Sequence, residues 1–90
     1  DLVALGALKQ CAESGARVPA DVSLVGCDDI EMARLVTPEL TTVTVPAREL
    51  GARAARLLVR QIAGEPPRPG SALLPVRLAV RGTTAPAPTA

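Results

Sequence analysis

Histidine and the aromatic residues Phe, Tyr and Trp are absent from the sequence. The absence of histidine removes the commonest metal ligand and the only side chain whose unperturbed pKa lies near neutrality. The absence of aromatic rings means that the large buried areas these rings usually supply must come from Leu, Val, Ile and Ala. The absence of histidine counts against a histidine-based catalytic or metal site. The absence of aromatic rings predicts a thin aliphatic core.

Cysteine is scarce as well. The two cysteines, Cys11 and Cys27, form no C-x-x-C motif. A structural zinc site needs about four Cys or His ligands at characteristic spacing, so we expect no such site. We interpret the two thiols as small buried hydrophobic groups, with an incidental disulfide as the alternative. Such sparse use of cysteine suits a reducing cytoplasm.

Long apolar runs and a clustered charge of one sign are also missing. No stretch approaches the ~18 apolar residues of a membrane span, and the chain does not open on a secretory signal pattern. Ten basic residues balance nine acidic ones, and the arginines are spread from Arg17 to Arg81. Because nucleic-acid-binding domains carry a clustered basic excess, this balance gives no reason to expect a phosphate-binding surface. We expect a soluble, cytoplasmic protein without membrane contact, metal or cofactor.

The order of predicted elements indicates an α/β fold. Leu2, Leu5 and Leu8 recur at helical spacing, and Gly15 follows where a left-handed helix stop is favoured. The segment VSLVG (residues 22–26) lacks polar alternation, which is typical of a strand covered on both faces. The remaining predicted elements are two helical turns over 30–36, a strand over 41–45, a helix over 46–63, a loop over 65–71 and a half-exposed strand over 74–81. This succession favours parallel sheets flanked by helices.

The predicted helix over 46–63 is amphipathic. Its inner stripe consists of Leu50, Ala54, Leu57, Leu58 and Ile62, and its outer stripe of Glu49, Arg53, Arg56 and Arg60. The arginine row is compatible with a DNA contact. However, Glu49 lies four residues before Arg53, a pairing typical of a solvated helix face, and no base-stacking aromatic is nearby. We therefore interpret the row as a solvated face.

Asp28 and Asp29 directly follow the predicted buried strand. In open α/β sheets, ligands gather beyond the carboxyl ends of the strands, and a carboxylate there accepts hydrogen bonds from sugar hydroxyls or from the N–H edge of a purine. Consecutive residues in extended structure point opposite ways, so we expect different roles, with Asp29 as the N-cap of the segment 30–36. Three interpretations stay open from the residues alone: a structural acidic loop, ligand recognition, or a catalytic or metal role.

Catalysis and metal binding have the least support. A general acid–base pair needs two carboxylates converging on one bond, and a hard cation needs about six oxygen ligands. The serines Ser14, Ser23 and Ser71 lie in no G-x-S-x-G motif, and no histidine exists to activate them. We therefore predict that the chain is not an enzyme.

Four motifs occur in a characteristic order along the chain. They are RVPADVSLVGCDDI (17–30), P-x-LTTV (38–43), ELG (49–51) followed by paired Ala and Leu residues, and LPVRLAVRGTT (74–84). Together, over residues 1 to about 84, they resemble the C-terminal part of the effector-binding domain of LacI/GalR-family transcriptional regulators.

The resemblance implies a fragment of a two-subdomain α/β fold like that of periplasmic sugar-binding proteins, with the effector in the cleft between the subdomains. Residues 1–84 would form an incomplete effector-binding domain, with about 1–44 and 75–84 in one subdomain and the helix over about 46–64 in the other. Residues 85–90 (APAPTA) have too little apolar bulk to fold, so from composition we expect a disordered tail. The implied function is effector sensing in a transcriptional regulator, most simply a repressor. That regulator would bind operator DNA as a homodimer through an N-terminal helix-turn-helix outside this chain, and its effector would be a small polar molecule such as a sugar or a purine-like compound.

The same resemblance assigns the ligand-binding role to Asp28, the first acid after the strand-ending glycine. Asp29 matches a second, more variable acid, and Cys27 replaces an aromatic residue usual beside the pocket. Asp1 matches the acid of an Asn-Asp pair, but the Asn that usually meets the ligand would precede it. Asp1 is therefore the weaker candidate.

Two other functional classes stay open. A sugar-binding protein of a transport or chemosensory system would share the fold, and a secretory signal in place of a helix-turn-helix would distinguish it. An interaction module that binds no small ligand would show an unchanged effector titration after Asp28→Asn. Family dimers pack partly through the helix that here holds Leu5 and through the segment 30–36, although a core role explains Leu5 about as well.

Overall fold

The computed structural model describes residues 1–67, 70 and 72–89, and its contacts divide the chain into two units. Unit 1 comprises Asp1–Val45 and Arg77–Ala90, and unit 2 comprises Pro46–Val76. The chain therefore leaves unit 1 after Val45 and re-enters it at Arg77, so residues distant in sequence share one unit. The predicted loop over 65–71 lies partly outside the described residues.

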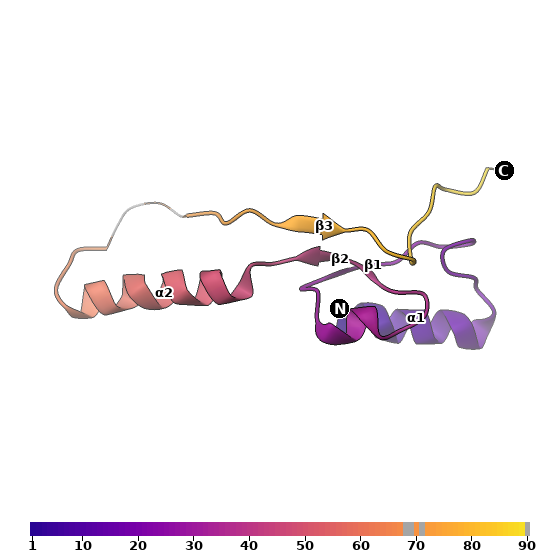
Figure 1. Cartoon of the computed structure of the whole chain (residues 1–90), viewed down its shortest axis with the longest axis horizontal. Coiled ribbons are helices and arrows are strands. Elements are labelled where there is room, and N and C mark those ends of the chain that lie inside the picture. The colour runs from indigo at the N-terminus through magenta and orange to yellow at the C-terminus, as the bar shows by residue number, and fades with distance from the viewer. Residues whose placement is uncertain (68–69, 71, 90) are drawn as a thin grey trace. The chain divides into compact units, whose positions relative to one another are not determined.

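Unit 1 contains a three-stranded mixed sheet (Figure 1). β1 (Val25–Cys27) pairs parallel with β2 (Thr41–Thr44), and β2 pairs antiparallel with β3 (Arg77–Ala79), so β2 is the central strand. α1 (Leu2–Ser14) contacts β1, and the short 3₁₀ helix η1 (Glu31–Arg34) lies between β1 and β2 along the chain. The parallel strand pair beside a helix confirms the predicted α/β class.

α1 ends where its sequence predicts. Gly15 adopts a left-handed conformation with φ 80° and ψ 7°, and the amide of Ala16 donates to the carbonyl of Cys11 at 3.0 Å. This closure satisfies a carbonyl that the last helical turn leaves unpaired, and glycine suits it because a side chain is strained at positive φ. The predicted apolar stripe is covered only in part, since Leu5 is half-buried whereas Leu2 is exposed.

The core of unit 1 is small and partly polar. Among the described residues, the buried side chains are Ala33 and Leu40, which are apolar, and Thr41, Thr42 and Thr83. The Thr83 hydroxyl donates to the carbonyl of Leu24 at 2.7 Å and accepts from the amide of Thr41 at 2.9 Å. Because each of these polar groups has a partner inside the protein, their burial is tolerated.

β1 is shorter and less covered than predicted. It begins at Val25 rather than at residue 22, and Val25 is 54% exposed. The expectation of a strand covered on both faces is therefore wrong for this chain. Where a strand packs against a helix on one face alone, the other face stays open to solvent.

The half-exposed strand predicted over 74–81 alternates apolar Val76, Leu78 and Val80 with Arg77, Ala79 and Arg81, and its apolar side chains are exposed in this chain. The predicted strand over 74–81 is regular at Arg77–Ala79, with Leu78 and Val80 58% and 70% exposed, whereas Arg81 is half-buried. The described residues therefore leave the apolar side chains of this strand uncovered, whereas Arg81 is half-buried because its guanidinium donates to a carboxylate and a carbonyl oxygen inside unit 1.

Unit 2 is built around α2 (Ala47–Ile62). The carbonyl of Pro46 accepts from the amide of Leu50 at 2.9 Å in the first turn. At the other end Gly64 has φ 102°, and the amide of Glu65 donates to the carbonyl of Arg60 at 3.1 Å. Proline at the start and glycine after the end agree with the helix limits predicted from the sequence.

The apolar stripe of α2 is exposed in this chain. Leu50, Leu57, Leu58 and Ile62 are 50%, 39%, 59% and 77% exposed. On the predicted outer stripe, Arg53 donates to Glu49 in an exposed i,i+4 ion pair of 3.2 Å, as a solvated face requires. No helix within residues 1–67 and 72–89 is both long and apolar enough to cross a membrane.

Candidate functional site

Three aspartates gather where β1 and β2 end. Asp28 and Asp29 follow β1 directly, and the backbone nitrogen of Asp1 donates to the carbonyl of Cys27, the last residue of β1, at 3.0 Å. The carboxyl ends of parallel strands lie at one edge of a sheet, which is where α/β proteins hold their ligands. The three carboxylates differ in what their oxygens contact.

Asp28 has the free carboxylate of the three. Its side chain is exposed, and it forms no ion pair within the described part of the chain. The thiol of Cys27 lies 3.9 Å from Oδ1 and is at most a weak donor. The backbone of Asp28 is held by a hydrogen bond, because its amide donates to the carbonyl of Val43 at 2.9 Å, and its φ is 109°. A carboxylate with open acceptor positions therefore stands at the edge of the sheet where the parallel strands β1 and β2 end.

Both carboxylate oxygens of Asp29 accept hydrogen bonds from other side chains of the chain. Its side chain is 7% exposed, and Oδ1 accepts from Nη2 of Arg81 at 2.7 Å. Oδ2 accepts from the hydroxyl of Thr44 at 3.2 Å and from Nη2 of Arg34 at 3.4 Å. The hydrogen bond from Arg81 lowers the pKa of the Asp29 carboxyl below its ordinary value of 3.8, against the opposing effect of burial. Asp29 is therefore a structural anion.

The predicted N-cap role of Asp29 is wrong. Ile30 precedes η1 as its cap residue, with φ −65° and ψ 157°, and no side chain caps the helix. An N-cap residue needs extended backbone angles, whereas Asp29 has a φ of 55° that turns its carboxylate elsewhere. Glu31 does lie in the first turn of η1, as expected.

Asp1 also has both oxygens engaged. Oδ2 accepts from the amide of Ile30 at 2.8 Å, and Oδ1 accepts from the hydroxyl of Thr42 at 2.6 Å. A Cβ added at Gly26 would overlap Oδ1 of Asp1, so the glycine allows this close approach. The carboxylate of Asp1 thus ties the start of α1 to β2 and to the segment after β1.

Sequence reasoning missed Arg81, Thr42 and Thr44 as parts of this cluster. Arg81 and Asp29 are separated by 52 positions, and strand alternation placed Arg81 on the solvent side. The available signal was the run of threonines that ends β2, since hydroxyls near a strand end can orient carboxylates. The run of threonines does not identify which carboxylate each hydroxyl binds.

The burial of the two cysteines differs from the prediction that both are buried. Both thiols are free, and Cys27 is exposed whereas Cys11 is half-buried. The interpretation of two buried small hydrophobic groups is wrong for Cys27. Within the residues that the structure describes, no group of three or more Cys, Asp or Glu side chains is arranged to hold a metal ion.

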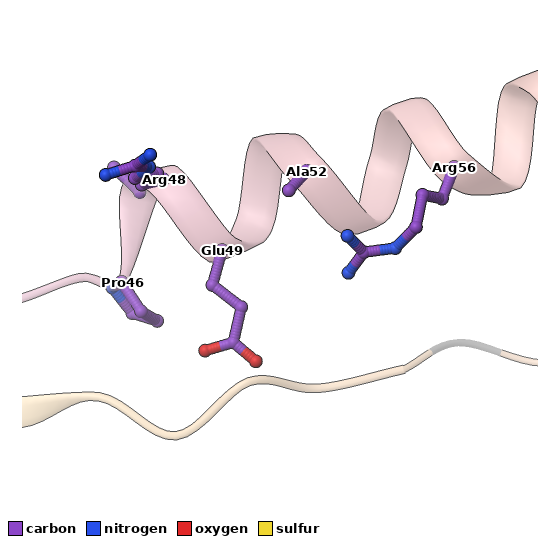
Figure 2. A pocket seen from close by; sticks show the side chains of 6 residues that line it. Pro46, Arg48, Glu49, Ala52 and Arg56 are labelled. Atoms are coloured by element: carbon purple, nitrogen blue, oxygen red, sulfur yellow. The ribbon is translucent and has the colours of Figure 1, made fainter.

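Unit 2 carries a separate open pocket at the start of α2. Its volume is about 540 Å³, and it is lined by Pro46, Ala47, Arg48, Glu49, Ala52 and Arg56. Figure 2 shows Glu49 and Arg56 projecting from the same side of the helix, with the small side chain of Ala52 between them. The pocket offers both a cation and an anion beside small side chains, a combination that the sequence did not single out.

Comparison with known proteins gives consistent matches. A model of the periplasmic binding protein-like domain matches residues 1–84. The HTH-type transcriptional repressor CytR of Escherichia coli is 40% identical over 84 residues, which are 93% of this chain and 25% of that protein. The lac repressor dimer, solved bound to operator and the anti-inducer ONPF, is 43% identical with a TM-score of 0.82 over 93% of this chain and 29% of that one. A LacI family regulator from an Arthrobacter species, solved with lactose, is 36% identical with a TM-score of 0.77 over 94% of this chain and 32% of that one.

The chain spans about a quarter of the length of the curated relatives it matches, with 25% coverage of CytR. The matched residues 1–84 include the whole carboxylate cluster, from Asp1 through Asp28 and Asp29 to Arg81.

Proposed function

Because the chain belongs to the family of periplasmic binding protein-like domains, as part of the effector-binding domain of a LacI/GalR-type regulator, we propose that it binds a small polar effector through Asp28. The observation that carries the proposal is the difference between the clustered aspartates. Asp1 and Asp29 have their oxygens committed to protein donors, whereas Asp28 is exposed and unpaired among the described residues. A carboxylate at this edge accepts hydrogen bonds from vicinal hydroxyls or from N–H groups.

The effector is a sugar or another polar metabolite with hydroxyl or N–H donors. It bridges Asp28 and groups of the other subdomain, so the closed state gains contacts that the open state lacks, and this difference drives the response. A hydrogen bond to a charged group contributes about 1.5–3 kcal/mol, which corresponds to about one to two orders of magnitude in affinity.

The intact protein, on this proposal, is a cytoplasmic transcriptional regulator that binds operator DNA as a homodimer, most simply as a repressor. Residues 1–84 of this regulator bind the effector and do not catalyse a reaction. The similarity to regulators solved with operator and with lactose supports this function over a transport or chemosensory sugar-binding protein. A helix-turn-helix upstream of Asp1 in the gene agrees with the proposal, and a secretory signal there contradicts it.

The test compares the intact regulator with its Asp28→Asn variant. Calorimetric titration with lactose, D-ribose and adenosine identifies a binding probe, and fluorescence anisotropy measures affinity for the DNA upstream of its own gene. We expect Asp28→Asn to raise the Kd of that probe by about 10-fold or more while operator affinity without the probe stays unchanged.

Asp21→Asn is the matched control. It removes a carboxylate that is also exposed and in unit 1, but Asp21 precedes β1 and so lies toward the opposite edge of the sheet from Asp28. Its Kd should equal that of the unmodified protein. If none of the three probes binds, or if Asp28→Asn leaves the probe Kd unchanged or weakens operator binding equally, the proposal is wrong.

A further inference from the structure

The backbone that presents Asp28 is unusual for residues with side chains. Asp28 and Asp29 both have positive φ, at 109° and 55°. Such conformations are costly for residues other than glycine and persist only where the surroundings hold them. Two hydrogen bonds to β2 contribute, from the amide of Asp28 to the carbonyl of Val43 at 2.9 Å and from the amide of Asp29 to the hydroxyl of Thr42 at 3.3 Å.

The carboxylate of Asp29 supplies the third attachment, and Arg81 is its main partner. The pair is 2.7 Å long, and the two side chains are 14% and 7% exposed. Arg34 is a weaker partner, because it is 66% exposed and lies 3.4 Å away. An exposed ion pair is screened by water, whereas a buried charge that loses its partner is left uncompensated.

Arg81 is fixed by contacts that do not involve Asp29. Its Nη1 donates to the carbonyl of Leu40 at 3.0 Å, and its backbone amide donates to the hydroxyl of Thr41 at 2.8 Å. Leu40 and Thr41 belong to the buried core of unit 1. Arg81 is therefore held in place independently of Asp29, and the carboxylate of Asp29 is bound to it.

We infer that Asp29 is a positioning residue, whose ion pair with Arg81 holds the positive-φ backbone that aims Asp28 at the effector. The inference rests on the proposed function of Asp28. Thr44, which also binds Asp29, is the last residue of β2 and lies opposite Arg77 in the β2–β3 register. The chain leaves unit 1 after Val45 and re-enters it at Arg77, so the same carboxylate contacts the segment that leads to unit 2.

The first test needs no effector. Hydrogen–deuterium exchange at residue resolution is measured on the intact regulator and on its Asp29→Asn variant. We expect faster exchange of the Asp28 amide, which is bonded to Val43, and unchanged exchange of the Leu24 amide, which is bonded to Thr83 at 2.9 Å. Asp21→Asn, which removes the exposed pair with Arg17, should change neither amide. Unchanged exchange at Asp28 in the Asp29→Asn variant would overturn the inference.

The second test is a double-mutant cycle of Asp28→Asn and Asp29→Asn, read as the Kd for the sugar or nucleoside found to bind among lactose, D-ribose and adenosine. We expect Asp29→Asn alone to raise this Kd by about 10-fold, and to have no further effect in the Asp28→Asn background. A merely structural role would lower the melting temperature but leave the Kd unchanged well below that temperature.

The outcomes separate the two proposals. If Asp28→Asn has no effect on the Kd, the proposed function fails. If Asp28→Asn weakens binding but Asp29→Asn does not, or if the two effects add, the proposed function stands and the positioning role of Asp29 is refuted.

Discussion

Asp1, Asp28 and Asp29 show how one residue type acquires separate roles within a small cluster. Asp1 accepts from a backbone amide and a hydroxyl, Asp29 accepts from Arg81, and Asp28 keeps its oxygens open to solvent. The local backbone decides the outcome, because a side chain at positive φ leaves in a direction that extended geometry does not allow. Of two adjacent aspartates, one can therefore serve as a structural anion while the other keeps a carboxylate free to accept hydrogen bonds.

The ionisation of Asp29 links this cluster to pH. Because the hydrogen bond from Arg81 lowers the pKa of Asp29 below 3.8 in the folded protein, its contribution to stability is fully present above pH 3.8. That contribution is lost as the pH falls through the folded-state pKa. Asp29→Asn should therefore lower the free energy of unfolding most at neutral pH, and the difference from the unmodified protein should shrink below pH 3.8. Denaturant unfolding from neutral to acidic pH measures this difference.

Asp21 provides the comparison for that titration. The hydrogen bond from Arg17 lowers the pKa of Asp21 to about 2, but the side chain of Asp21 is 42% exposed and that of Arg17 is 75% exposed. Solvent screens such a pair, so Asp21→Asn should change the free energy of unfolding less than Asp29→Asn at neutral pH. A difference between Asp29→Asn and the unmodified protein that stays constant down to the lowest pH would contradict this account.

At the scale of elements, the segment after β3 joins the strands of unit 1. The carbonyl of Thr83 accepts from the amide of Leu24, and its hydroxyl bonds Leu24 and Thr41. Ala85 exchanges two hydrogen bonds with Ser23, at 3.1 and 3.3 Å, although the sequence assigned it to a disordered tail. A chain segment that is not itself a regular strand therefore holds β1 beside β2.

Thr83→Val tests this connection. Valine has nearly the same shape but leaves the amide of Thr41 and the carbonyl of Leu24 without their buried partner. Because each unsatisfied buried group costs about 1–3 kcal/mol, we expect the variant to be less stable by about 2 kcal/mol or more. Thr83→Ser, which keeps the hydroxyl, should retain most of the stability. Equal denaturation midpoints for the valine variant and the unmodified protein would show that the hydroxyl contributes nothing.

Local signals predicted the elements, whereas contacts between distant residues could not be predicted. Gly15 and Gly64 mark the helix ends because positive φ favours glycine, and the β-branched run at 41–45 gave β2 nearly to the residue. The position of Asp28 at a strand end followed from the same reasoning. The ion pair between Asp29 and Arg81 did not, because no periodicity relates positions that follow different strands.

At the scale of the whole molecule, side chains whose sequence pattern predicts burial are exposed in both units. The apolar stripe of α2 and the apolar side chains of β3 are patterned to be covered, yet Leu58, Ile62 and Val80 are 59%, 77% and 70% exposed. The chain spans about a quarter of the length of its curated relatives, 25% in the case of CytR. The pattern matches that of the longer relatives, so we expect elements outside this chain to cover these side chains.

This disagreement predicts how the isolated segment of residues 1–90 behaves. The buried apolar side chains among the described residues are Ala33 and Leu40, and α2 has none. Complete burial of one leucine or isoleucine contributes about 1.5–3 kcal/mol, so uncovering several removes most of the stability available to a small domain. The isolated segment should bind a hydrophobic dye and show no cooperative thermal transition by circular dichroism, whereas the intact regulator should melt cooperatively. A monomeric segment with a sharp transition and no dye binding would mean that units 1 and 2 are stable without the covering elements.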